Sequence, residues 1–329
     1  MNFKFQRPDM AEEAAKTGGK NVFLEILMFI GVYLASMFCE LLPVSIAEMV
    51  VMVMNPEIMK ASMLGDIALA MELMEPYMDV LMIIQLFSTS MMILATILFC
   101  KLIQKRKVTT LGYKKPGMWK EYGIGMLVGL GMMTLIVLIG TLTGAISLQF
   151  NPAAATGAGV GMLLLLFVGF LIQGMAEEVL CRGYFLVSLA RKDGKVWMGI
   201  IVSSVAFAAL HLGNSGIAPL AFVNLILFGV FAGVYFIRRG NIWGVCAIHS
   251  IWNFAQGNIF GVLVSGNNFG TTIFNASINE EMTIINGGSF GLEGGILTTI
   301  VLVAATVITL CTKQKDIAVE EPVKVAEAV

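Results

Sequence analysis

The chain has 329 residues, of which 57% are hydrophobic and only 13% are charged, and its mean hydropathy is +0.85. Because soluble domains carry roughly 25% charged residues, this composition excludes an ordinary soluble protein. The formal net charge of −1 is uninformative by itself. Apolar runs of about 18 residues or more recur along the whole length, and each is long enough to cross a hydrocarbon core of about 30 Å. The sequence therefore predicts an all-α polytopic membrane protein.

About eight apolar segments are predicted to span the membrane as helices. In chain order they cover residues 22–46, 80–102, 122–148, 159–182, 197–213, 217–237, 242–264 and 291–312. We expect the fourth helix to continue along the membrane interface to about residue 190. The polar start of the chain contains no apolar signal-peptide core, so no cleavable signal is predicted. Both terminal tails are expected to be disordered.

Lysine and arginine are distributed asymmetrically among the segments that connect these helices. Of the 21 basic residues, all but two lie in alternate segments on the same predicted side, namely 1–21, 101–120, 191–195, 238–239 and 313–329. The exceptions are Lys60, in an opposite loop, and Arg182, within a span. By the positive-inside rule, the basic segments and both termini are expected to be cytoplasmic.

Ionisable side chains within the predicted spans are the candidates for chemistry, because inserting a charge costs roughly 2.5–3.5 kcal/mol on insertion scales. The candidates are Glu25, Glu40, Glu177, Glu178, Arg182, His211 and His249. We interpret Glu25 and Glu40 as interfacial or packing residues. Small residues in the spans, such as Gly229 and Gly233, are interpreted as helix-packing positions.

The stretch EEVLCR in the fourth span contains three of these charges. Glu178 and Arg182 are four residues apart, so they share a helix face and are expected to form an ion pair. Glu177 points about 100° away from Glu178, because an α-helix has 3.6 residues per turn. The pattern therefore predicts one supporting pair and one unpaired carboxylate.

Two further stretches place polar side chains at the same helical spacing. Phe207 and His211 are four residues apart in FAALH, and His249 and Asn253 are four apart in HSIWN. At 1.5 Å per residue from the nearest basic residue, Glu177 lies about 21 Å deep, His211 about 24 Å, His249 about 15 Å and Asn253 about 21 Å. This agreement in depth favours one intramembrane site that water reaches from the cytoplasm.

The residue types allow two interpretations of this site. A carboxylate and an imidazole that converge on a water molecule can act as a general base. A second imidazole and a carboxamide can donate hydrogen bonds to a developing oxyanion, as amide hydrolysis requires. Alternatively, Glu177, His211 and His249 surround a Zn²⁺ ion that keeps one open position. The HExxH signature of zinc proteases is absent.

The three motifs, EExxxR, FxxxH and HxxxN, occur in the order that is typical of one family. They resemble the CPBP family of intramembrane proteases, named for CAAX processing and bacteriocin processing, which includes type II CAAX prenyl endopeptidases and Abi-type bacterial proteins. The resemblance covers about residues 120–265. It implies an eight-span helical fold with a cavity open to the cytosol and to lipid.

The resemblance also implies a role for each matching residue. Glu177 would activate water together with His211, and His249 and Asn253 would stabilise the oxyanion. Glu178 and Arg182 would support the fourth helix, and Phe207 belongs to the second motif. Members of the family have been treated both as metalloproteases and as glutamate-dependent proteases, and the sequence leaves both open, with zinc as the possible cofactor.

On this interpretation the chain divides into five parts. They are a cytoplasmic tail (1–21), N-terminal helices with a basic loop (22–120), a CPBP-type catalytic core (121–265), an extracytoplasmic loop with the last helix (266–312) and a second cytoplasmic tail (313–329). The short loops resemble those of bacterial members, which favours the plasma membrane of a bacterium.

The expected partners are the lipid bilayer and a peptide or membrane-protein substrate, with no nucleic acid. The substrate would be matured as a bacteriocin, a pheromone or a CAAX-like protein. Two other functions remain as alternatives: a bacteriocin self-immunity or scaffold protein without catalysis, and a proton-coupled transporter that uses Glu177 and the histidines as a relay.

Overall fold

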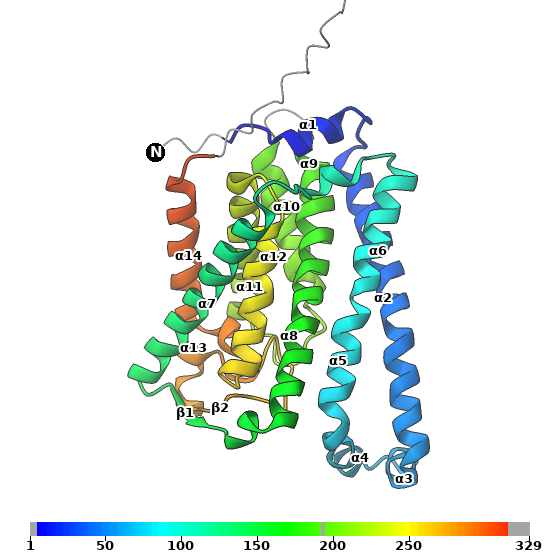
Figure 1. Ribbon diagram of the computed structural model, residues 1–329, viewed down its shortest axis with the longest axis vertical. Helices are drawn as coiled ribbons and strands as arrows, with labels where there is room; N and C mark the ends of the chain where they lie inside the picture. Colours follow the sequence, from blue (N-terminus) through cyan, green and yellow to red (C-terminus); the bar gives the residue numbers. More distant parts are fainter. Residues whose placement is uncertain (1–4, 192–194, 315–329) are drawn as a thin grey trace, which may run out of the picture.

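The computed structural model describes residues 5–191 and 195–314 as a bundle of long helices (Figure 1). The helices are α1 (Asp9–Ala15), α2 (Val22–Met54), α3 (Pro56–Met63), α4 (Ile67–Met74), α5 (Met78–Ser88), α6 (Ser90–Leu98), α7 (Met118–Leu142), α8 (Gly157–Glu178), α9 (Val187–Ala190), α10 (Val196–Leu210), α11 (Pro219–Arg239), α12 (Trp243–Phe254), α13 (Thr283–Asn286) and α14 (Ile296–Cys311). Within the described residues, the strands β1 (Ile146–Phe150) and β2 (Phe274–Ile278) form one antiparallel sheet in which Leu148 is paired with Ala276.

Five helical segments in the described ranges are long and apolar enough to cross a membrane. They are Val22–Met54, Ile67–Ile103, Met118–Leu142, Gly157–Ala190 and Pro219–Arg239. Shorter apolar helices cover Val196–Leu210 and Ile296–Cys311. The prediction of an all-α polytopic membrane protein is confirmed. Each of the eight predicted spans contains a helix, but the exact number that cross the membrane stays a prediction.

Several predicted boundaries differ from those of the structure. The first helix continues to Met54, beyond the predicted end at 46, so the α2 helix projects with α3 and α4 at one end of the bundle (Figure 1). Helix α7 ends at Leu142, because Gly144 adopts a positive φ of 75° and the chain then turns into β1. Helix α12 is followed by a π-helical turn, Ala255–Ile259, and then by a loop.

Small residues allow the central helices to approach closely. A Cβ atom on Gly125 of α7 would lie 2.2 Å from the carbonyl oxygen of Gly244 on α12. A Cβ atom on Gly229 of α11 would lie 2.7 Å from the Cα atom of Ser204 on α10. Gly233 of α11 likewise faces Ile200 of α10. The predicted packing role of Gly229 and Gly233 is therefore confirmed, since small residues bring transmembrane backbones together.

The N-terminal segment is folded where disorder was expected. Helix α1 buries Met10, Ala11 and Ala14 against the end of the bundle that α9 forms. Hydrogen bonds from Lys16 and Lys107 lower the pKa of the Glu13 carboxyl to about 2. A seven-residue helix with a small apolar face does not stand out in a polar sequence, so its periodicity gave no signal. The expected disorder of the C-terminal tail falls largely on residues 315–329, which lie outside the described residues.

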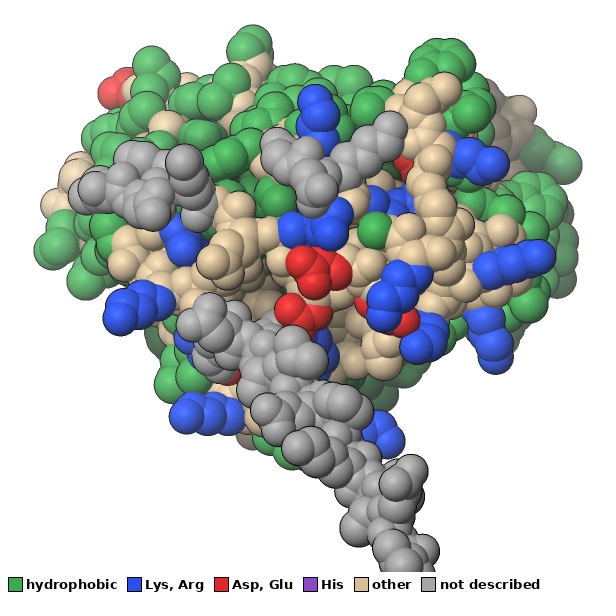
Figure 2. Space-filling view, turned by 90° about the horizontal axis from the view of Figure 1, so that it is seen from above, with side chains coloured by type: hydrophobic (Ala, Val, Ile, Leu, Met, Phe, Trp, Pro, Cys, Tyr) green, Lys and Arg blue, Asp and Glu red, His purple; other side chains and the backbone are tan. Residues whose placement is uncertain are grey.

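The two ends of the bundle differ in charge and in covering. Lys and Arg side chains gather on the end that carries α1, as Figure 2 shows from above. At the opposite end, loops fold back between the helices and are held by side-chain amides. The Asn224 amide of α11 donates to the carbonyl oxygens of Glu293 (2.7 Å) and Gly295 (2.9 Å). These loops therefore cover the end of the bundle opposite α1.

Candidate active site

The fourth long helix changes its geometry directly after the two glutamates. Helix α8 ends at Glu178, and the chain continues without a break as a π-helix, Val179–Leu186. Such π-helical turns widen the helix and occur frequently at functional sites. Glu178 and Arg182 are both fully buried, and the Nη1 atom of Arg182 donates to Oε1 of Glu178 over 2.6 Å. The predicted ion pair is present.

His211 lies where helix α10 stops inside the bundle. The helix ends at Leu210, and His211 is its C-terminal cap, followed by a turn that contains Gly216 with a φ of 73°. The Nδ1 atom of His211 lies 2.8 Å from the carbonyl oxygen of Phe207, so this nitrogen carries a proton and donates it. The Nε2 atom of His211 is therefore free to accept a hydrogen bond.

The carboxylate of Glu177 faces both histidines. Its Oε2 atom lies 3.9 Å from Nε2 of His211 and 3.8 Å from Nε2 of His249. The same Oε2 atom is buried and has no hydrogen-bond partner among the described residues. Contacts of this length leave the three polar atoms too far apart for direct hydrogen bonds, but close enough for one water molecule to bridge them.

Glu178 does more than the sequence suggested. Its Oε1 atom accepts from Arg182 and also lies 2.9 Å from Nδ1 of His249. A carboxylate only accepts, so Nδ1 of His249 carries the proton and the ring is fixed in orientation. The sequence predicted the Glu178–Arg182 pair but gave no sign that the pair holds a histidine on another helix.

Gln173 is a site residue that the sequence analysis missed. Its Nε2 atom donates to Oε1 of Glu177, and its Oε1 atom accepts from Nδ2 of Asn253 over 3.0 Å. Gln173 precedes Glu177 by four residues, so the two share a face of α8. Gln173 is not ionisable and was therefore not among the candidates, and its spacing of four residues from Glu177 was the available signal.

Phe207 forms the apolar wall behind the two histidines. Its ring centroid lies 4.8 Å from that of His211 and 5.8 Å from that of His249. The guanidinium carbon of Arg182 lies 4.6 Å from the centre of the same ring. This cation–π contact compensates in part for the Nε and Nη2 atoms of Arg182, which are buried without partners among the described residues.

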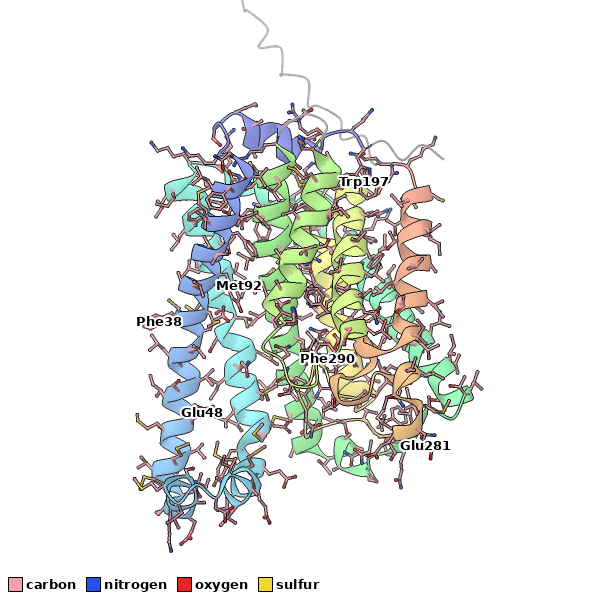
Figure 3. All side chains as sticks on the ribbon, turned by 180° about the vertical axis from the view of Figure 1, so that it is seen from behind. Phe38, Glu48, Met92, Trp197, Glu281 and Phe290 are labelled. Carbon is pink, nitrogen blue, oxygen red and sulfur yellow. The ribbon has the colours of Figure 1, made fainter. Side chains whose placement is uncertain are left out.

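The side chains of Glu177, His211, His249 and Asn253 open into one cavity of about 550 Å³. The cavity extends toward the end of the bundle opposite α1, where its lining includes the exposed residue Asn267. Figure 3 places two further lining residues, with Met92 near mid-height on the α5–α6 helix and Glu48 lower on α2. On the side of α1, residues 179–191 are all buried.

The access to this cavity differs from the expectation. The sequence favoured water that reaches the site from the side of the basic segments, whereas the lining extends to the other side. The reason is that the π-helix after Glu178 and the docked helix α1 fill the basic end. Counting residues along one helix gives the depth of a side chain in the membrane. It does not show at which end of the bundle other segments cover the site.

The two glutamates that were interpreted as structural have different surroundings. Glu25 is buried and forms an ion pair with Arg191, and it also accepts from Nε2 of Gln104. This contact pattern fits the structural interpretation. Glu40 instead lines the cavity, and its Oε1 atom is buried without a partner among the described residues.

Glu293, close to the start of the last helix, was not among the sequence candidates and also lines the cavity. Its Oε2 atom accepts from the backbone N–H of Ser265 over 2.6 Å and from the hydroxyl of Ser265 over 3.0 Å. Its position, within the predicted span 291–312, was the signal that could have found it.

The alternative zinc site was tested against the arrangement of the donors. In the described ranges, no group of three or more His, Cys, Asp or Glu side chains is arranged to hold a metal ion. The Nδ1 atom of each candidate histidine is hydrogen-bonded, in His211 to a carbonyl oxygen and in His249 to Glu178, and the Nε2 atoms face Glu177. Zinc binding stays a prediction, and we derive no step through a metal.

Comparison with known proteins addresses the family directly. A family model described as type II CAAX prenyl endopeptidase Rce1-like matches residues 158–255. The match covers 98 of the 329 residues, which are called the Rce1-like domain, and it confirms the resemblance to the CPBP and CAAX proteases for this part of the chain. The Rce1-like domain runs from α8 to the turn after α12, and so contains Glu177, His211, His249 and Asn253.

The Rce1-like domain accounts for part of the cavity only. Helix α2, which supplies Glu40 and Glu48 to the wall, and helix α5, which supplies Met82 and Gln85, lie outside the matched residues. No curated protein and no solved structure matches the chain.

Proposed function

We propose that this protein is an intramembrane endopeptidase that uses Glu177 and His211 to activate a water molecule. The observation that carries the proposal is the position of Oε2 of Glu177, which lies 3.9 Å and 3.8 Å from the Nε2 atoms of His211 and His249. The atom is buried, unpaired among the described residues and open to the cavity. It is therefore placed to accept a proton from a bridging water.

The reaction follows from the groups that surround this water. Glu177 takes one proton of the water as its oxygen attacks the carbonyl carbon of the scissile peptide bond, and His211 orients the water through Nε2. The carbonyl oxygen becomes negative and accepts hydrogen bonds from Nδ2 of Asn253 and from Nε2 of protonated His249. The C–N bond then breaks, and Glu177 returns the proton to the leaving nitrogen.

Glu178 supports the charge that this step requires. Because Nδ1 of His249 already donates to Glu178, a donor at Nε2 exists only when the ring is an imidazolium. The carboxylate of Glu178 stabilises that cation, and its ion pair with Arg182 holds the carboxylate in position. Gln173 holds both Glu177 and Asn253, so one amide sets the distance between the base and the oxyanion donor.

The substrate is a membrane-associated peptide or protein. Met37 and Leu41 of α2 line the cavity and are exposed, and α2 is long and apolar enough to cross a membrane, so a chain anchored in the bilayer could enter the cavity beside this helix. With the basic end in the cytoplasm of a bacterial plasma membrane, the cavity extends toward the outer side. This geometry favours maturation of an exported peptide, such as a bacteriocin or pheromone, over processing of a cytosolic CAAX protein.

The test is cleavage of a lipidated peptide library by the protein in proteoliposomes, read by mass spectrometry. We expect products from the wild-type protein and none from Glu177→Gln. Glu72→Gln, at an exposed position on α4, is the matched control and should cleave as the wild type does. Products that are identical for wild type and Glu177→Gln, or proton flux without any cleavage, would overturn the proposal.

A further inference from the structure

The cavity is lined by carboxylates, and the basic side chains among its described lining residues are the imidazoles of His211 and His249. Its acidic residues come from three regions of the chain: Glu40 and Glu48 on α2, Glu177 on α8, and Glu293 before α14. None of the described residues that line it is lysine or arginine. A cavity with low-dielectric walls and an excess of negative charge attracts ligands of positive charge.

Three acids of the helices are paired with arginines, whereas Glu40 is not paired with one in the described part of the chain. Glu25 is paired with Arg191, Glu121 with Arg239, and Glu178 with Arg182. Each of these pairs offsets the desolvation of the carboxylate with a nearby guanidinium. The Oε1 atom of Glu40 is also buried, yet it has no hydrogen-bond partner among the described residues.

Glu40 and Glu177 line the same cavity. Glu177 has His211 and His249 beside it, whereas Oε1 of Glu40 has no hydrogen-bond partner among the described residues. Buried ionisable groups in a membrane face a cavity or a partner and mark the path of a substrate. A basic group of the substrate is therefore a suitable partner for Glu40.

The remaining walls suit the stem of a long basic side chain. Phe170, Phe228 and Trp252 line the cavity, and the rings of Phe228 and Trp252 meet edge to face with centroids 5.7 Å apart. Aromatic faces attract ammonium and guanidinium groups, and the alkyl stem of lysine or arginine packs on apolar surface.

We propose that Glu40 is a specificity-determining residue that binds a lysine or arginine side chain of the peptide substrate within the cavity. The proposal rests on the proposed endopeptidase function and adds the substrate class, a membrane-associated peptide with a basic residue near the scissile bond. Because Glu40 lies outside the Rce1-like domain, this preference belongs to the N-terminal helices of this chain rather than to the matched domain.

The test uses lipidated peptides that share one cleavable sequence found with the library above. In one series a single lysine, glutamine or glutamate is moved through the positions on either side of the scissile bond. Every peptide is made with an acetylated and with a free N-terminus, which separates a side-chain cation from a terminal ammonium. The enzymes are wild type, Glu40→Gln, Glu40→Lys and the surface controls Glu72→Gln and Glu72→Lys.

We expect kcat/KM of the wild type to be about 10- to 100-fold higher with lysine than with glutamine at one position, the range that a hydrogen bond to a charged group supplies. Glu40→Gln should lose this preference and still cleave the glutamine peptides, which shows that it is folded. Glu40→Lys should prefer glutamate at that position. The Glu72 variants should behave as the wild type does.

Equal rates for lysine and glutamine at every position, with Glu40→Gln unchanged, would overturn the proposal while the endopeptidase function stands. A preference that follows the free N-terminus rather than the side chain would also overturn it. If the wild type cleaves no peptide, or only peptides that Glu177→Gln also cleaves, the proposed function itself would be overturned.

Discussion

The Nδ1 atom of His249 lies 2.9 Å from Oε1 of Glu178, which also accepts from Arg182. This contact connects two of the three motifs across the interface between α8 and α12. It makes Glu178 the group that fixes the proton and the orientation of a histidine in the site. The second glutamate of the motif therefore acts through His249, whereas Glu177 faces the water position directly.

Replacement of Glu178 by glutamine should reduce both stability and turnover. The amide leaves Arg182 without its carboxylate in a fully buried position, and loss of one partner of a buried pair costs about 3–5 kcal/mol. It also removes the charge that stabilises protonated His249, so kcat should fall while KM changes little. Thermal unfolding in detergent and peptide cleavage by the folded fraction measure the two effects.

The matched control for this variant is Glu121→Gln. It breaks the pair between Glu121 and Arg239, where the Nε–Oε2 and Nη2–Oε1 distances are 2.7 and 2.8 Å, and neither residue lines the cavity. This control should lower the melting temperature and leave kcat of the folded protein unchanged. Equal kcat in Glu178→Gln and Glu121→Gln would contradict the role of Glu178.

Adding a methyl group at two glycines of helix α7 should have different effects, because one glycine is closely packed and the other faces open space. Gly125→Ala should lower the melting temperature, because the new Cβ atom would lie 2.2 Å from the Gly244 carbonyl oxygen. Overpacking of this kind costs about 1–3 kcal/mol. Gly131→Ala on the same helix meets nothing within 4 Å and should be neutral or slightly stabilising. Equal melting temperatures for the two variants would contradict the described packing of α7 on α12.

The direction of the cavity can be tested with cysteines at the two ends of the bundle. In a background that lacks the exposed Cys39 and Cys311, Asn267→Cys should react with a membrane-impermeant maleimide added to intact bacterial cells. Thr17→Cys, next to α1, should react only after the membrane is opened. Labelling of both positions from the same side would contradict the assignment of these segments to opposite ends.

The absence of a three-ligand arrangement among the described residues leads to a prediction on metal removal. Cleavage by the purified protein should survive dialysis against a chelator. Elemental analysis measures zinc in the same samples. Stoichiometric zinc that disappears in His211→Ala, together with loss of cleavage on chelation, would contradict water activation by Glu177 and His211 alone and would support direct ligation.

The sequence predicted the helices and the supporting ion pair because both depend on local spacing. Apolar runs determine the spans, and a separation of four residues determines which side chains share a helix face. The link from Glu178 to His249 was not predictable in this way, since it depends on how α8 and α12 are rotated against each other. The π-helix after Glu178 also changes the face that each following residue presents.

The part of the cavity wall that α2 forms could not be predicted from the sequence for a different reason. Glu40 has the same signal as Glu25, a lone acid in an apolar helix, and only packing shows that one is paired and the other is not. The docking of α1 on the basic end likewise depends on three small buried contacts from Met10, Ala11 and Ala14. These contacts form between segments that are distant in the sequence.

The central claim is that the Glu177 carboxylate activates the water that cleaves the peptide bond. The most direct measurement is the cleavage rate of Glu177→Gln against the wild type at saturating peptide, with melting temperatures to confirm equal folding. General-base catalysis contributes about 10²- to 10⁴-fold, so we predict a fall in kcat of at least that size. Cleavage by folded Glu177→Gln within a few fold of the wild-type rate would contradict the account.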